Sequence, residues 1–242
     1  MRERWGRPRY LVTAGALLVI LFVLNLIPTG YFTVQPGPLR SLEGVVAVDG
    51  RPEPAGSFYM VSVVAREASA FDAARAAFDP SIALWPKAAV YGGASPEQYV
   101  EDSRGMMEDS QRTASYLAFR ESGFPVEPAS ALPLPVTVNS GEVMGPSAGL
   151  AFALEMISTL AGADLTGGKR VAATGVLDLD GNVGAVGGIA QKAVSCRLNG
   201  IDLFLVPATD AAEARRHAGA VQVVGVRNLG EAVRYLRGDD TP

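Results

Sequence analysis

The sequence predicts a mixed α/β (α+β) fold that follows an N-terminal membrane-spanning helix. The first observation is a long N-terminal run without charged side chains. The second is a break at residues 124–135, where four prolines leave little room for regular structure. The third is the alternation of helical and strand patterns after that break, which is typical of layered α/β domains. We therefore expect a basic tail (1–9), a transmembrane helix (10–28), a small α/β region (40–123) and a larger domain with mixed sheets and packed helices (126–238).

The N-terminus has the pattern of a membrane anchor. Residues 1–9 contain four arginines and one glutamate, and residues 10–27 contain no charged side chain. This apolar run approaches the ~20 residues that span a bilayer as a helix, and Pro28 should end the helix. A cleaved signal peptide is the alternative, but the run is long and no small-x-small cleavage site follows it. We expect a single-pass protein of the cell membrane, with the arginines in the cytoplasm and the rest of the chain outside.

Between the anchor and the proline-rich break, we expect a linker, a hairpin and two helices. Residues 35–38, with two prolines and a glycine, read as the linker. The valine-rich segments 44–48 and 57–65 flank a Gly/Pro turn and predict a β-hairpin. The helices should follow over 68–78 and 96–122, with Gly123 after the second.

After the break, the pattern predicts short strands that alternate with helices. Asp180 and Gly181 provide the turn of a hairpin between 170–179 and 182–186. Strands are expected at 136–139, 203–207 and 221–226, and helices at 146–160, 189–198, 211–217 and 229–236.

The composition narrows the range of functions. The formal net charge is −4, and no basic cluster lies outside the N-terminus, so nucleic acid is not an expected partner. The chain has one cysteine and one histidine, which excludes an internal disulfide. Cys196 reads as a packed thiol of the core, and we expect neither a metal nor a cofactor.

Ser147 and Lys192 are the candidate catalytic residues. Ser147 lies in GPSAG (145–149), at the start of a helix that is apolar almost all round and should be buried. Backbone N–H groups at such a helix start, together with the helix dipole, can stabilise an oxyanion. Lys192 lies at the edge of the apolar face of the helix 189–198, where burial would lower its pKa toward that of a general base. A capping serine and a surface lysine are the structural alternatives.

Together these segments resemble the proteolytic domain of Lon-type serine proteases. The similarity covers about 110 residues, 126–237, and places the serine of that family at Ser147 and its lysine at Lys192. It implies a Ser-Lys dyad that hydrolyses peptide bonds, with Thr174 holding the amine toward the serine. We expect the main chain at Gly145, Ala148 and Gly149 to stabilise the oxyanion or to allow the substrate to approach closely. Lon-type domains commonly form rings, so the resemblance also allows a homo-oligomer.

The N-terminal half is similar to bacterial membrane-anchored Lon-like proteases that carry a PDZ module, but this chain departs from them. Only a dozen residues separate Gly123 from Val136, too few for a PDZ domain. The segment 162–169 has one residue too many for a phosphate-binding loop, and Arg170 replaces the Ser or Thr. We therefore expect an ATP-independent endopeptidase whose substrates are unfolded or flexible extracytoplasmic polypeptides.

Two other functions fit parts of the pattern. GPSAG also satisfies the G-x-S-x-G motif of α/β-hydrolase esterases, but that motif needs a strand leading directly into the serine and a catalytic histidine. The only histidine, His217, lies on a charged helix end. The other alternative is a membrane-tethered scaffolding protein on the same fold, because a fold does not by itself determine function.

Overall fold

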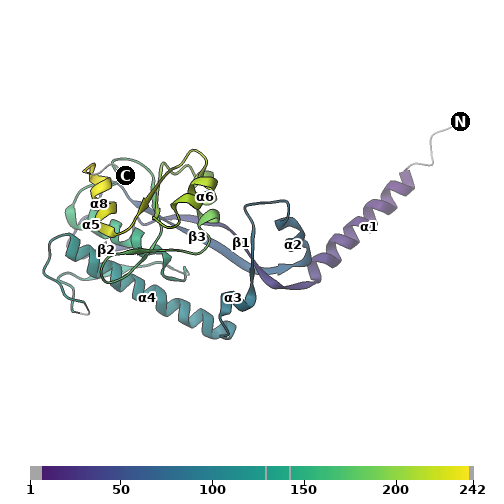
Figure 1. Cartoon of the computed structure of the whole chain (residues 1–242), viewed down its shortest axis with the longest axis horizontal. Helices are drawn as coiled ribbons and strands as arrows, with labels where there is room; N and C mark the ends of the chain where they lie inside the picture. Colours follow the sequence, from purple (N-terminus) through teal and green to yellow (C-terminus); the bar gives the residue numbers. More distant parts are fainter. Residues whose placement is uncertain (1–6, 129, 142, 240–242) are drawn as a thin grey trace. The chain divides into compact units, whose positions relative to one another are not determined.

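The computed structural model describes residues 7–128, 130–141 and 143–239, with side chains from residue 10 onward (Figure 1). Most of the expected basic tail, residues 1–6, lies outside the described residues. The chain forms two compact units, one of Met1–Gln35 with Val64–Gly93 and one of Pro36–Val63 with Ala94–Pro242. The break at residues 124–135 lies inside the second unit. Helices and sheets are mixed, in agreement with the predicted α/β class.

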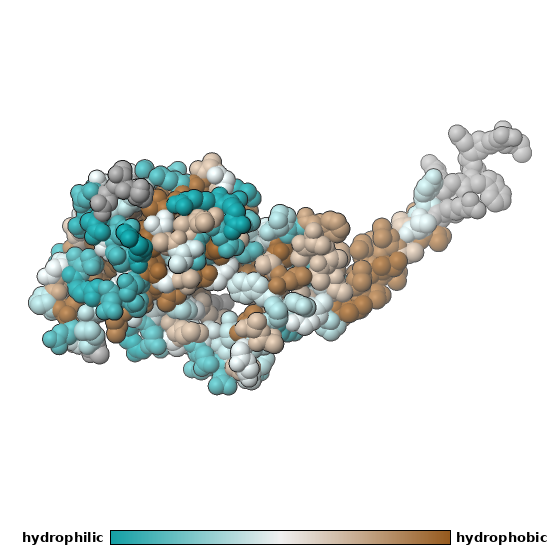
Figure 2. All heavy atoms as spheres, viewed as in Figure 1, coloured by the Kyte–Doolittle hydropathy of each residue, from teal (hydrophilic) through white to brown (hydrophobic). Residues whose placement is uncertain are grey.

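The first unit begins with helix α1, Arg7–Leu26, whose described side chains are mostly exposed and apolar. Figure 2 shows them as a brown surface along the helix. Among the described residues, no helix is long and apolar enough to cross a membrane. The expected transmembrane helix over 10–28 is therefore not found. The charge-free part of α1 is shorter than the ~20 residues of a span, and the chain enters a strand at Pro28.

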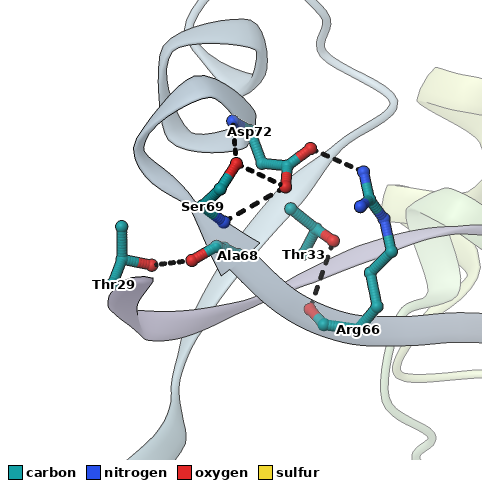
Figure 3. Close-up of polar contacts among 6 residues, drawn as sticks. All are labelled: Thr29, Thr33, Arg66, Ala68, Ser69 and Asp72. Carbon is teal, nitrogen blue, oxygen red and sulfur yellow. Dashed lines mark hydrogen bonds and ion pairs between the residues drawn. The ribbon is translucent and has the colours of Figure 1, made fainter. Parts of the chain in front are cut away.

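The rest of the first unit is a small sheet with two short helices. The beginning of β1 (Pro28–Ser41) pairs antiparallel with β4 (Ala83–Pro86), and the end of β3 (Phe58–Ser69) leads into α2 (Ala70–Ala76). A capping box starts α2: the Ser69 hydroxyl accepts from the Asp72 N–H, and the Asp72 carboxylate accepts from the Ser69 N–H. Arg66 donates to the same carboxylate, which satisfies this buried charge (Figure 3). Helix α3 (Lys87–Tyr91) follows β4.

In the second unit, a parallel sheet has the order β10-β9-β6-β3. Besides β3, its strands are β6 (Val171–Ala173), β9 (Leu203–Pro207) and β10 (Gln222–Val226). Alternate residues of these strands face two separate apolar cores. One core lies under α4 (Pro96–Glu121), α5 (Gly149–Ala161) and α8 (Leu229–Arg237), and the other lies under α6 (Ile189–Leu198) and α7 (Ala211–Ala218). Helices thus cover both faces of the sheet, and α4, α5, α6 and α8 are labelled in Figure 1.

The helices and strands after the break follow the predicted pattern closely. Helix α6 and strand β9 have the predicted bounds. The predicted hairpin is present as β7 (Val176–Leu177) and β8 (Val183–Gly184), which pair antiparallel around Gly181, whose φ is 92°. The predicted helix 146–160 begins instead as a 3-10 turn, η1 (Pro146–Ala148), and continues as α5.

Two predictions in the N-terminal half are wrong. The segments 44–48 and 57–65 do not form a hairpin: β2 (Val46–Val48) pairs antiparallel with β5 (Val136–Val138), and β3 pairs in parallel with β6. The expected linker 35–38 lies inside strand β1. A strand tolerates prolines where no partner needs their N–H group, and the main chain of β1 approaches β3 so closely that a Cβ on Gly37 would lie 2.7 Å from the Ser62 carbonyl oxygen.

Candidate active site

Three elements bring Ser147, Thr174 and Lys192 together at the carboxyl end of strand β6. Ser147 lies in η1, ahead of α5 on one face of the sheet. Lys192 lies in the first turn of α6 on the other face, where its main-chain N–H donates to the Gly188 carbonyl. Thr174 directly follows β6, between the two helices. Ligand sites of α/β sheets characteristically lie at this edge, beyond the carboxyl ends of the strands.

The side chains of these residues are in direct contact. Lys192 Nζ lies 2.9 Å from Ser147 Oγ and 3.0 Å from Thr174 Oγ1. Thr174 Oγ1 also donates to the Ser147 carbonyl oxygen, at 3.0 Å, and the Gly175 N–H reaches the same oxygen at 2.9 Å. Thr174 therefore holds the amine with its hydroxyl lone pair and the serine main chain with its hydroxyl proton.

Burial changes the protonation of the amine. Lys192 is 2% exposed and Thr174 is 1% exposed, whereas Ser147 is only half-buried. Burial lowers the Lys192 pKa from 10.5 to about 8, and the nearby Asp210 carboxylate opposes this shift. At pH 7, roughly one tenth of this lysine is thus a free amine with its lone pair available to the serine hydroxyl.

The backbone around Ser147 is tightly constrained. Gly145 has φ 87° and ψ 158°, a conformation that is essentially restricted to glycine, and its N–H donates to the Ser103 carbonyl. The Gly149 N–H donates to the Pro146 carbonyl, and a Cβ at Gly149 would lie 2.8 Å from Ser110 Oγ. Ala148 is buried. Ser147 is the second residue of η1, so its own N–H has no partner within that turn.

Two buried polar residues of α4 and α5 were not predicted. Ser110, on the buried face of α4, donates to the Pro146 carbonyl at 2.9 Å and so fixes the turn before the serine. Glu155 lies in the middle of α5, is 2% exposed, and accepts the Phe58 N–H at 2.7 Å. Burial raises the Glu155 pKa to about 7 against the effect of that hydrogen bond. The sequence signal for Glu155 was a single acid in an apolar helix, whereas Ser110 gave no signal beyond its position.

Cys196 and His217, the cysteine and histidine of the chain, take no part in these contacts. Cys196 is fully buried, and burial raises its pKa to about 12, as expected of a core thiol. His217 lies in the last turn of α7. The strand β5 ends nine residues before Ser147, so it does not lead directly into the serine as in an α/β-hydrolase elbow. Within the described part of the chain, no group of three or more His, Cys, Asp or Glu side chains could hold a metal ion.

The fold and site define an α/β protein with a hydroxyl and a buried amine in contact at the carboxyl edge of a parallel sheet. Residues 104–222 match the model of the Lon protease (S16) C-terminal proteolytic domain. The chain is 30% identical over 138 residues to the Lon protease of Rhizobium meliloti (strain 1021). The aligned segment covers 54% of this chain and 17% of that protein. For the Lon protease of Brucella suis biovar 1 (strain 1330), the identity is 31% over 138 residues, with the same coverage of 54% and 17%. The Lon protease of Neorickettsia sennetsu is 30% identical over 95 residues, 38% of this chain and 11% of the relative.

Residues 104–222 therefore correspond to a Lon-type proteolytic domain, and the resemblance to that domain seen in the sequence is confirmed. The chain spans about 17% of the length of the first relatives that it matches.

Proposed function

We propose that this chain is a serine endopeptidase that uses Ser147 as nucleophile and Lys192 as general base. The observation that carries the proposal is the 2.9 Å contact between Lys192 Nζ and Ser147 Oγ, made by an amine that is almost fully buried. The similarity to Lon proteases supports peptide bonds as the substrate.

The proposed reaction begins when Ser147 Oγ attacks the carbonyl carbon of the scissile peptide bond while its proton passes to Lys192 Nζ. Thr174 Oγ1 accepts one N–H of the amine, which directs the nitrogen lone pair toward Ser147. The Ser147 N–H and the dipole of α5 stabilise the negative charge that develops on the carbonyl oxygen.

The tetrahedral intermediate then breaks its C–N bond. Lys192 returns the proton to the departing amine, which leaves the acyl group as an ester on Ser147. In the second half-reaction, Lys192 takes a proton from water as the water attacks the ester. Collapse of that intermediate frees the acid product and protonates Ser147 again.

We further propose that the activity needs no ATP. The segment 162–169 follows the end of α5 and precedes β6. A phosphate-binding loop requires the opposite order, from strand to helix. A peptidase that does not use ATP to unfold its substrates would be limited to unfolded or flexible polypeptides.

We also propose, from the N-terminal sequence, that the protein is located at the cell membrane. Arginines before an apolar segment favour a protein held at the cell membrane with its N-terminus in the cytoplasm and its catalytic domain outside. The exposed apolar side chains of α1 are available for lipid. Membrane fractionation, followed by external protease treatment of intact cells, tests this location: the catalytic domain should be degraded while an N-terminal tag stays protected.

The activity is tested by hydrolysis of fluorescently labelled casein, an unfolded polypeptide, with and without ATP. Ser147→Ala and Lys192→Arg should each lower hydrolysis by at least about 1,000-fold. The first removes the nucleophile, and the second replaces the amine by a guanidinium, which cannot act as a base near neutral pH. ATP should make no difference to the wild type. Normal turnover by Lys192→Arg would refute the proposed base. Replacement of His217 by alanine is the matched control, and it should leave hydrolysis unchanged.

A further inference from the structure

Strand β5 has an open edge that is ready to pair with another strand. Among the described strands, β5 pairs only with β2. The Asp49 N–H donates to the Pro135 carbonyl and the Asn139 N–H to the Val45 carbonyl. Hydrogen-bonded pairs alternate along an antiparallel ladder, so residues 135, 137 and 139 face β2. Val136 and Val138 therefore direct their N–H and C=O groups to the opposite edge.

Two adjoining cavities lie beside this edge. One has a volume of about 400 Å³ and is lined by Val136 and Val138, and the other has a volume of about 640 Å³ and is lined by Val138 and Met144. Both are bounded by Glu108 and Gln111 of α4, so they form one groove between that helix and β5. The groove reaches Met144, three residues before Ser147.

The wall of the groove next to Ser147 is held in place by hydrogen bonds. Gln111 Nε2 donates to Ser140 Oγ at 3.0 Å, and Arg40 donates to the Ser140 carbonyl at 2.8 Å. The Gly145 N–H bonds to the Ser103 carbonyl at 3.1 Å. Ser140 and Gly145 are thereby fixed to β1 and α4, so this wall of the groove is formed before any ligand enters.

We propose that an extended segment of the substrate polypeptide binds in this groove as a third strand, paired with the main chain of Val136 and Val138. The proposal rests on the proposed peptidase activity and identifies how that site holds its substrate. An unpaired strand edge selects an extended main chain, because it offers alternating donors and acceptors that side chains do not match. Folded proteins cannot present such a segment, so the groove would favour unfolded substrates. Because the contacts are made to the main chain, the groove accepts many sequences and favours long substrates over short ones.

The first test compares two substitutions at one position in the full chain. Val138→Pro removes the N–H that faces the groove and spares the bonds to β2, and edge strands tolerate proline. Val138→Ala loses a similar amount of packing but keeps the N–H. Val138→Pro should raise KM for labelled casein about tenfold with kcat unchanged, as expected for a lost main-chain hydrogen bond and a blocked edge. Val138→Ala should leave this KM near the wild-type value.

Cleavage of a fluorogenic tetrapeptide reports on the catalytic residues alone. Its kcat/KM should fall much less in Val138→Pro than the kcat/KM for casein does, because a tetrapeptide is too short to occupy the groove. An unchanged KM for casein in Val138→Pro, or equal losses with both substrates, would overturn the proposed groove. Absence of any Ser147-dependent hydrolysis in the wild type would instead refute the proposed function.

A second measurement requires no change in β5. In Ser147→Ala, the Val136 and Val138 amides should exchange their hydrogens rapidly and the Thr137 amide slowly, because of these three amides only that of Thr137 faces β2. Adding casein should slow the exchange at Val136 and Val138. No slowing would contradict the proposal. Slowing that depends on protein concentration without casein would contradict it too, since a second copy of the chain would then occupy the edge.

Discussion

The pH dependence of peptide hydrolysis should follow the deprotonation of Lys192. The buried amine has a pKa of about 8 in place of 10.5, and only its neutral form can accept the Ser147 proton. At pH 7, about one tenth of the lysine is neutral, about 300 times more than for a lysine with the ordinary pKa. We expect kcat/KM to rise about tenfold per pH unit below pH 7 and to level off above pH 8 to 9.

Asp210 provides a directed change in this profile. Its carboxylate raises the Lys192 pKa, so Asp210→Asn should lower that pKa and move the rising limb to lower pH. The amide keeps an oxygen that can accept the Val186 N–H, which the carboxylate accepts at 2.9 Å. Glu213→Gln removes the same charge from an exposed position on α7 and should leave the profile unchanged.

The assay is kcat/KM for a fluorogenic peptide without ionisable groups, measured from pH 5.5 to 10 in wild type and both variants. Midpoints are compared at constant ionic strength, because salt screens exposed charges more than buried ones. A wild-type midpoint near 10.5 would show that Lys192 has an ordinary pKa, and an Asp210→Asn midpoint above that of wild type would show that the Asp210 carboxylate does not raise it.

Three further predictions concern two residues beside the site and one buried acid of α5. Thr174→Val removes the hydroxyl that contacts both Lys192 and the Ser147 carbonyl, so kcat should fall about tenfold or more with KM unchanged, and Thr174→Ser should restore most of it. Gly145→Ala places a Cβ in a conformation restricted to glycine, so urea denaturation should show a loss of about 1–3 kcal/mol. An unchanged denaturation midpoint would exclude this strain. Glu155 has its pKa raised from 4.5 to about 7, so the folded state holds its proton more tightly and stability should fall by about 3 kcal/mol as the pH rises from 4.5 to 7. Glu155→Gln should flatten this slope, and an equally steep slope in the variant would assign it to other groups.

Local signals in the sequence predicted most of the second half of the chain. Helix α6 has a glycine before its first residue, β9 is a continuous apolar strand, and the β7–β8 hairpin has an Asp-Gly turn. Each of these features depends on residues that are close in the sequence. The dyad candidates were found in the same way, from a serine at a helix start and a lysine beside an apolar face.

Pairing between distant segments was not predictable in this way. Val46–Val48 and Phe58–Ser69 have the composition of a hairpin, but β2 pairs with a strand some 90 residues further along the chain. Strand composition shows that a segment is extended and does not identify its partner. The prolines at 36 and 38 indicated a linker, although they lie in β1. The contacts of Ser110 and Thr174 with the main chain around Ser147 likewise depend on how α4 and β6 pack against η1.

The most direct test of the account is the titration of the Lys192 side chain itself. Lysine labelled with ¹⁵N at Nζ can be followed by NMR from pH 6 to 11, and Lys192→Arg identifies the signal. We expect a midpoint near 8, well below those of the exposed lysines, because burial disfavours the ammonium form. A midpoint near 10.5 would show that Lys192 stays charged at neutral pH and would contradict its role as the base for Ser147.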